Sequence, residues 1–261
     1  MKSKLRLFVL FVIVLTGLNN ITAQDFKEFR KSFNINKNGE VILDTYKGEV
    51  TIEPSGSDVV EVYARIEPDR GGFLSTSEKK QLENATVLFD ASSNSVRIKS
   101  EYKHNSSWFG SNTMALVFYT IKMPKTASLK VKDYKSDSDI SGLESPIEFE
   151  TYKGRVKVRN LNGSIDLETY KGEVNVRFVN LTGNSKFDTY KGDISVTLPK
   201  NSAFSFDTDF GKRVDFENDF NLSRKSSGRK SKNYNYSGDV NGGGQKIKMS
   251  SDKGNLRLLA N

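Results

Sequence analysis

A five-residue motif, Asp-Thr-Tyr-Lys-Gly, recurs along the chain and limits the folds that are open to it. It lies at 44–48 and 188–192, with Glu replacing Asp at 150–154 and 168–172, and in altered form at 133–136, 207–211 and 251–254. The position after the lysine falls at residues 136, 154, 172, 192 and 211, giving spacings of 18, 18, 20 and 19 residues. A repeat near 20 residues is too short for helix–turn–helix units and is typical of a solenoid coil. We therefore expect an all-β fold, a single-stranded β-helix-like β-solenoid with coils of about 18–20 residues.

Apolar residues alternate with polar ones on both sides of each motif, which predicts two short strands per coil. The threonine of the motif falls in the inward register, and the acidic residue, tyrosine and lysine fall outward. The glycine follows where the chain must turn a corner. Five coils, at about 4.8 Å each, would give a stack about 25 Å long. The residues predicted to point inward are Phe149, Thr151, Val156, Val158, Leu167, Thr169, Val174, Val176, Phe187, Thr189, Ile194 and Val196.

The segments around the repeats differ from them in character. Residues 24–126 are predicted to form a β-rich N-terminal part that includes a hairpin, Ala85–Ala91 with Ser95–Tyr102. This part holds the one helix we expect, Ser75–Ala85, with Ser75 and Glu78 as a capping box. Residues 127–261 are predicted to form the solenoid repeats, of which 212–261 would be an irregular C-terminal cap.

The N-terminus has the pattern of a signal peptide. Lys2, Lys4 and Arg6 precede an apolar run at 7–15, and residues 1–23 would be removed by cleavage after Ala23. The alternative, an uncleaved anchor, needs about 20 apolar residues, more than this run contains. The chain has no cysteine, which excludes a lipoprotein signal and disulfides. We expect an exported protein, periplasmic, at the cell surface or secreted, with no membrane span after cleavage.

The charge of the chain does not by itself indicate a partner. The formal net charge is +8 and falls to +5 when the three basic residues of the signal peptide are removed. Mild basicity on a mixed surface does not by itself indicate nucleic acid binding, and export argues against it. The densest basic run, at 224–232, is typical of a solvated loop; docking on an anionic surface is the alternative.

An ordered set of motifs resembles the bacterial putative-adhesin family, a domain of unknown function found on exported or envelope proteins. The set begins with Tyr119-Thr120-Ile121-Lys122-Met123-Pro124 and continues with Gly-x-(Val/Ile)-x-(Val/Ile) through the repeats. It closes with Gly242-Gly243-Gly244 and Lys253-Gly254-Asn255-Leu256. The resemblance covers most of the chain after residue 23. It implies a β-solenoid with a β-rich N-terminal part, and it carries over no catalytic residues.

The tyrosines of the motif are the main candidate site. Exposed aromatic rings beside carboxylates can stack on sugar rings and bind their hydroxyls, so a glycan-binding strip is one hypothesis. The other is a structural ladder, in which stacked rings cover each other and columns of opposite charge offset repulsion. We expect the last four tyrosines to stack on successive coils. The candidate residues are Tyr46, Tyr134, Tyr152, Tyr170, Tyr190, Glu150, Glu168 and Asp188.

The residues Asp137-x-Asp139-x-Ser141-Gly142 with Glu148 match the spacing of an EF-hand calcium loop. However, Glu144 stands where an apolar residue is usual, and no helices are predicted on either side. The periodicity of the solenoid already explains this spacing. We therefore predict no metal and no cofactor.

Catalysis has few residues to use. His104 is the only histidine and there is no cysteine, so Ser-His or Cys-His triads and metal clusters lack parts. Trp108 and Phe109, near His104, could line a small binding loop or cover the edge of the core. We predict a non-catalytic exported binding or scaffold protein of the bacterial cell envelope, whose partner is a cell-envelope glycan or an envelope protein. The alternatives are a carbohydrate-active enzyme resembling a polysaccharide lyase on a β-helix, and an envelope-stress sensing partner.

Overall fold

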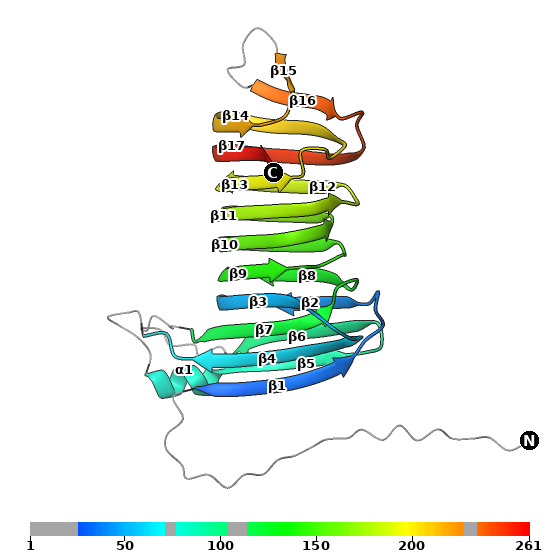
Figure 1. Cartoon of the computed structure of the whole chain (residues 1–261). Coiled ribbons are helices and arrows are strands. Elements are labelled where there is room, and N and C mark those ends of the chain that lie inside the picture. The colour runs from blue at the N-terminus through cyan, green and yellow to red at the C-terminus, as the bar shows by residue number, and fades with distance from the viewer. Residues whose placement is uncertain (1–25, 71–76, 104–113, 227–233) are drawn as a thin grey trace, which may run out of the picture.

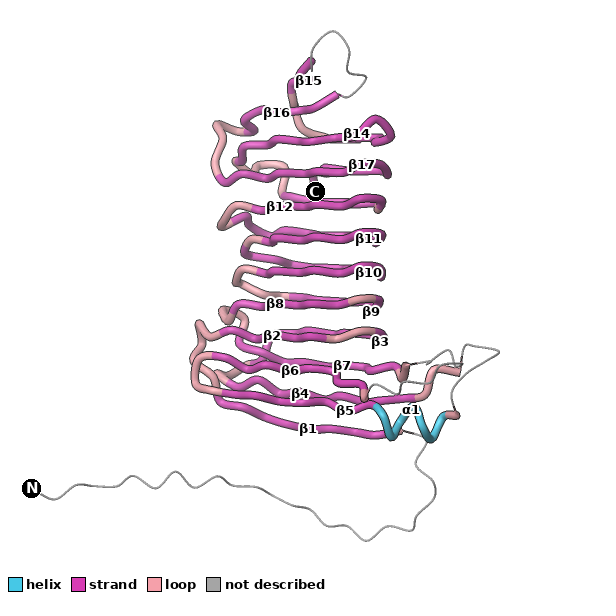
Figure 2. Tube along the Cα trace, turned by 180° about the vertical axis from the view of Figure 1, so that it is seen from behind, coloured by secondary structure: helices cyan, strands magenta, loops and turns pink. Residues whose placement is uncertain are grey.

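The computed structural model describes residues 26–70, 77–103, 114–226 and 234–261, and these residues form an elongated stack of strands (Figures 1 and 2). Three features predicted from the sequence lie outside the described residues: the signal peptide at 1–23, the loop with His104, Trp108 and Phe109, and residues 227–232 of the basic run. Within the described residues, no helix has the length and apolar character needed to cross a membrane.

The structure confirms the predicted β-solenoid. Its elements are β1 (Lys27–Asn34), β2 (Glu40–Asp44), β3 (Lys47–Ser55), β4 (Val59–Glu67), α1 (Glu78–Asn84), β5 (Ala85–Ala91), β6 (Ser95–Tyr102), β7 (Leu116–Pro124), β8 (Ser128–Asp133), β9 (Lys135–Ser141), β10 (Ile147–Gly163), β11 (Ile165–Leu181), β12 (Ser185–Lys191), β13 (Asp193–Leu198), β14 (Phe204–Asn218), β15 (Ser223–Ser226), β16 (Tyr234–Val240) and β17 (Gln245–Ala260).

Each coil is a bent strand pair with the motif at the bend. The segments before the bend pair in parallel and form what we call the first sheet: β6, β2, β8, the first halves of β10 and β11, β12, and the first halves of β17 and β14. The segments after the bend form the second sheet in the same way: β7, β3, β9, the second halves of β10 and β11, β13, and the second halves of β17 and β14.

The order of coils in the stack differs from their order in the sequence. The coil of β2 and β3 lies between β6/β7 and β8/β9, and β17 lies between β12/β13 and β14 (Figure 1). The five coils predicted from the spacing are therefore not all consecutive in the stack, because β17 separates the coil of β12 and β13 from that of β14. The motif copies at 44–48 and 251–254 also belong to the stack, because parallel pairing is satisfied by any coil with the right register.

The predicted irregular cap at 212–261 was also wrong in part. Residues 245–260 form a regular coil inside the stack, and of the strands that the structure describes β15 and β16 continue beyond β14, in antiparallel pairing. The division of the chain at residue 126 remains a proposal. Strands from both sides of it pair with each other, β2 with β8 and β3 with β9.

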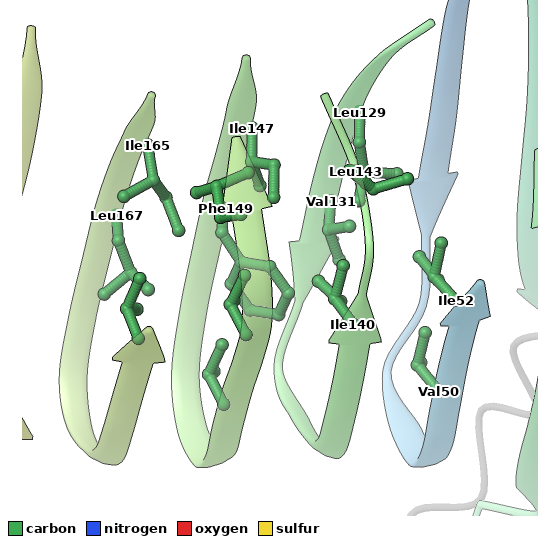
Figure 3. Close-up of a cluster of buried hydrophobic side chains, with 14 of the residues drawn as sticks. Val50, Ile52, Leu129, Val131, Ile140, Leu143, Ile147, Phe149, Ile165 and Leu167 are labelled. Atoms are coloured by element: carbon green, nitrogen blue, oxygen red, sulfur yellow. The ribbon is translucent and has the colours of Figure 1, made fainter. Parts of the chain in front are cut away.

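The space between the two sheets is filled by the inward-facing side chains that the alternation predicted. Val156, Val174 and Phe187 are completely or almost completely buried, as is the whole predicted apolar set. Figure 3 shows such side chains from both arms of successive coils pointing into the space between them. Burying a Val, Leu, Ile or Phe side chain contributes roughly 1.5–3 kcal/mol, so each coil adds a repeated increment of stability.

Antiparallel strands close the N-terminal end of the stack. β4 pairs with β7 and β1 with β4, while β5 pairs with β6 in the predicted hairpin. Phe33 and Phe89 bring the two sheets together there, with ring centroids 5.8 Å apart. The predicted helix is present as α1, but its N-cap residue is Ser77 and no side chain caps it. The capping box of Ser75 with Glu78 was therefore wrong, because Glu78 is the first helical residue.

Candidate functional site

The bend of each coil is a tight corner that places successive backbones in close contact. Gly154 has φ +129°, a conformation that L side chains rarely adopt, and an added Cβ would lie 2.0 Å from the Ser136 carbonyl oxygen in the coil beneath. At Gly172 the reason is contact alone, since a Cβ would lie 2.8 Å from the Gly154 carbonyl oxygen. The glycine of the motif thus fixes where the neighbouring tyrosine leaves the backbone.

The five tyrosines form one continuous column of stacked rings along the corner. Ring centroids of successive tyrosines are 4.6, 4.9, 4.8 and 4.9 Å apart, and ring planes are within 10° of parallel. The sequence predicted that the last four would stack, and Tyr46 joins them because its coil lies directly beneath that of Tyr134. We call this set the tyrosine column: Tyr46, Tyr134, Tyr152, Tyr170 and Tyr190.

Stacking covers the faces of the rings and leaves their edges exposed. Tyr102 packs edge-on against Tyr46 at one end, and the Lys253 ammonium lies 4.9 Å from the Tyr190 ring centroid at the other. Even so, Tyr190 is 42% exposed, so ring edges and hydroxyls still face solvent. A ligand can contact these edges, but it cannot lie on a ring face as a sugar does in face-to-face stacking. This geometry favours the ladder as the main role of the rings.

A groove of about 710 Å³ runs along the first-sheet side of the tyrosine column. Glu150, Glu168 and Asp188 occupy equivalent positions on successive coils and line it. Lys132 lies 3.1 Å from Glu150 and Lys186 lies 3.5 Å from Asp188, whereas Glu168 has no ion-pair partner among the described residues. Five of the six charged residues that line the groove are carboxylates, although the chain as a whole is basic. The other charged lining residues are Lys132, Asp133 and Asp252.

A row of lysines lies on the opposite side of the tyrosine column. The Lys153 and Lys171 ammonium groups are 5.4 and 5.2 Å from the centroids of the Tyr152 and Tyr170 rings. Lys47 forms an ion pair with Asp69. The corner thus presents three parallel rows: carboxylates, tyrosine edges and ammonium groups. We call the third set the lysine row: Lys47, Lys135, Lys153, Lys171, Lys191 and Lys253.

Asp133 is a groove residue that sequence reasoning missed. Register aligns it with Thr151, so it takes the inward position of the motif threonine, and Lys132 takes the outward acidic position. Burial raises the pKa of the Asp133 carboxyl, against hydrogen bonds that favour its charged form. It accepts these from the Ser136 amide at 2.9 Å and the Thr151 hydroxyl at 2.8 Å. Counting back three residues from Ser136, the glycine equivalent, would have revealed the substitution.

The structure does not bring together the residues that match the EF-hand spacing. Asp137 and Asp139 lie on β9 in the second sheet, where they pair with Arg155 at 2.6 Å and Arg159 at 2.7 Å. Glu148 lies on β10 in the first sheet and pairs with Lys130. In the described parts of the chain, no group of three or more His, Cys, Asp or Glu residues is placed to hold a metal ion.

The chain is similar to several solved structures across most of its length. A putative cell adhesion protein from Clostridium sporogenes is 11% identical, with 90% of this chain and 100% of that chain covered and a TM-score of 0.45. A putative adhesin from Bacteroides fragilis is 10% identical, with 89% and 97% covered and a TM-score of 0.36. A putative lipid binding protein from Parabacteroides distasonis is 7% identical, with 88% and 96% covered and a TM-score of 0.31.

No curated protein matches the chain. The profile of the Toastrack DUF4097 family matches residues 20–259, which is almost the whole sequence. This match confirms the family resemblance that was drawn from the ordered motifs. The chain belongs to the Toastrack DUF4097 family.

Proposed function

We propose that this protein is a non-catalytic binding and scaffold protein, exported to the bacterial cell envelope, and that its binding site is the groove beside the tyrosine column. The observation that carries the proposal is the groove itself, about 710 Å³ in volume and lined on three successive coils by a carboxylate and a tyrosine edge. A site repeated along a rigid stack suits an elongated partner, because each coil offers the same contact. The names of similar structures as adhesins agree with a binding role.

The proposed partner is a cell-envelope glycan or an envelope protein. Carboxylate oxygens accept hydrogen bonds from sugar hydroxyls and from protein N–H donors. The covered ring faces mean that tyrosine would contribute edges and hydroxyls instead of a stacking platform. Glu168 is the sharpest candidate contact, since it has no ion-pair partner among the described residues and is exposed in the middle of the groove.

Capture of envelope material tests the proposal. Immobilised protein is exposed to a glycan array and to envelope extracts, and Glu168→Gln is expected to reduce capture at least tenfold. The matched control is Glu173→Gln, a carboxylate that is also exposed and lies on the same strand, but on the second sheet. Equal capture by both variants would refute the groove as the site.

A second pair of measurements separates binding from architecture. The double variant Tyr152→Ser/Tyr170→Ser is compared with the wild type in melting temperature and in capture. A lower melting temperature with unchanged capture would assign the tyrosine column to structure alone. Incubation with polysaccharides tests the non-catalytic part of the proposal, since new reducing or unsaturated ends would identify a carbohydrate-active enzyme instead.

A further inference from the structure

The two charged rows of the corner have opposite signs and the same spacing. Lys153 and Lys171 are in register with each other on β10 and β11, as are Glu150 and Glu168, so both rows repeat once per coil. Among the described residues, Lys135, Lys153, Lys171 and Lys191 have no carboxylate partner within ion-pair distance. The lysine row therefore holds unpaired like charges close together along the stack, and in the carboxylate row Glu168 also lacks an ion-pair partner, whereas Glu150 and Asp188 are paired with Lys132 and Lys186. Unpaired like charges in a row are unfavourable unless something of opposite charge faces them.

A two-fold axis parallel to the stack would relieve both rows at once. Rotation by 180° about an axis just outside the tyrosine column exchanges its two sides while keeping every coil at its own level. The lysine row of one molecule then faces the groove carboxylates of the other. Lys153 would meet Glu150, Lys171 would meet Glu168, and Lys191 would meet Asp188 of the second copy. An axis perpendicular to the stack would instead place like charges together.

From this symmetry we infer that a second copy of this chain docks on the corner, with the tyrosine edges of the two molecules in contact and their stacks parallel. The inferred dimer rests on the proposed function, since it assigns a second copy of the chain as the partner of the same groove. Charge complementarity favours the second copy: five of the six charged residues that line the groove are carboxylates, and the lysine row, which has the same spacing, lies on the other side of the same rings. A two-fold arrangement closes on itself, so it yields a dimer.

The same geometry fixes how strong and how salt-sensitive the dimer is. At the coil of β8 and β9, Lys135 would face Lys132 of the second copy, and this pair would repel. The pairs at the next three coils would attract. The contact involves only the corner of each molecule. We therefore expect it to bury less surface than the roughly 800 Å² per partner of a standard interface. We expect weak association that is visible at high protein concentration in low salt. It should weaken at least tenfold in about 1 M salt, where screening acts over about 3 Å.

Charge reversal gives the decisive test, by sedimentation equilibrium in low salt. One variant carries Lys153→Glu, Lys171→Glu and Lys191→Glu, and a second carries Glu150→Lys, Glu168→Lys and Asp188→Lys. Each alone should be monomeric, because both of its rows have one sign, and an equimolar mixture should form a heterodimer. The control reverses three exposed basic residues on the outer face of the second sheet, Lys122, Lys157 and Arg177, and should dimerise like the wild type.

A cross-link keeps the inference testable if the reversed variants fail to fold. The chain contains no cysteine, so Tyr190→Cys introduces a single thiol at the end of the column, next to the proposed axis. Mild oxidation should give a disulfide-linked dimer in low salt and mainly monomer in 1 M salt. Thr120→Cys, exposed on the second sheet, should stay monomeric.

A wild type that remains monomeric in low salt, or a mixture of reversed variants that does not associate, would overturn the dimer. These outcomes are distinct from failure of the proposed function. If the wild type is monomeric but Glu168→Gln still loses capture of envelope glycan or protein, the groove binds that partner and not a second copy. If association and capture are both insensitive to the groove variants, both proposals fall.

Discussion

The corner at residues 133–136 shows how one coil can depart from the repeat and keep its shape. Ser136 stands where other coils have glycine, and it is fully buried against the backbone of the coil above. Asp133 replaces the buried threonine and accepts hydrogen bonds from the amides of Lys135 and Ser136. A carboxylate that binds two successive amides stabilises a turn without glycine. Asp133, which departs from the repeat, therefore stabilises the bend that glycine stabilises in the other coils.

Asp133 and the neighbouring Asp137 should change the stability of the protein with pH in opposite directions. Burial raises the pKa of Asp133 in the folded state, so its protonated form is favoured there and its contribution to stability falls as pH rises. The sign is opposite for Asp137: partial burial acts against ionisation, but hydrogen bonds from Arg155 outweigh it and lower the pKa. In chemical denaturation, the free energy of unfolding of Asp133→Asn should rise relative to that of the wild type between about pH 3 and pH 7. The free energy of unfolding of Asp137→Asn should fall relative to that of the wild type over the same range. Trends of the same sign in both variants would contradict the opposite pKa shifts of the two carboxyls.

Gly154 offers a test of the close approach between coils. Gly154→Ala should lower the free energy of unfolding by about 3 kcal/mol, because the φ of +129° is strained for alanine and the Cβ meets a carbonyl oxygen. Gly56→Ala is the control: its Cβ would meet no atom within 4 Å, and the effect should stay within about 0.5 kcal/mol. Equal effects in urea denaturation would mean that the coil of Ser136, beneath Gly154, can move away.

At the scale of the element, the tyrosine column is a cross-coil ladder. A ring inside the column stacks on two others, and a ring at its end stacks on one. Aromatic pairs contribute about 0.5–1.5 kcal/mol beyond area burial, so removal of Tyr152 breaks two such contacts and removal of Tyr190 breaks one. The ladder also holds the carboxylate and lysine rows apart, which ties the stability of the column to the chemistry of the groove.

Tyr152→Ala should therefore destabilise the protein by about twice as much as Tyr190→Ala, on the order of 1–3 kcal/mol against 0.5–1.5 kcal/mol. Thermal melting monitored by circular dichroism measures the difference, and the two residues share their position in the motif, so each controls for the other. Loss of the Lys253 contact is expected to raise the effect at Tyr190 only slightly. Identical losses would show that the rings do not act as a stack.

At the scale of the whole molecule, the interleaved coil order ties distant parts of the chain together. β17 is the last strand, yet it pairs with β12 and β13 on one side and β14 on the other. It buries Ile247, Met249, Leu256 and Leu258 completely. At roughly 1.5–3 kcal/mol each, these four side chains supply about 6–12 kcal/mol, which is comparable to the total stability of a typical domain, about 5–15 kcal/mol.

Deletion of residues 245–261 should consequently prevent stable folding, because it removes a coil from the interior of the stack. The control is deletion of 222–240, which removes β15 and β16 from beyond the last coil and should leave a cooperative melting transition. Circular dichroism and hydrogen exchange distinguish the two outcomes. A folded protein after loss of 245–261 would show that β14 can pair directly with β12 and β13.

The sequence alone determined the form of a single coil. Strict alternation around a motif with a fixed position for glycine is a local signal, and it predicted the buried set, the outward tyrosines and the hairpin of β5 and β6. Of the groove lining, the sequence predicted the three outward carboxylates and the three tyrosines beside them, Glu150, Glu168, Asp188, Tyr152, Tyr170 and Tyr190. Lys132, Asp133 and Asp252 were missed, because the copies that carry them are altered and their register is set by pairing with other coils.

The order of the coils was decided only by the tertiary structure. Parallel pairing between equivalent coils offers nearly the same hydrogen bonds and the same apolar contacts whichever coil comes next, so a repeat pattern contains little information about neighbours. The choice depends on long connections and on the ends, where β2 and β3 enter beneath β8 and β9, and β17 inserts below β14. For this reason Tyr46 joined the tyrosine column, and Asp252 closed the groove, from opposite ends of the chain.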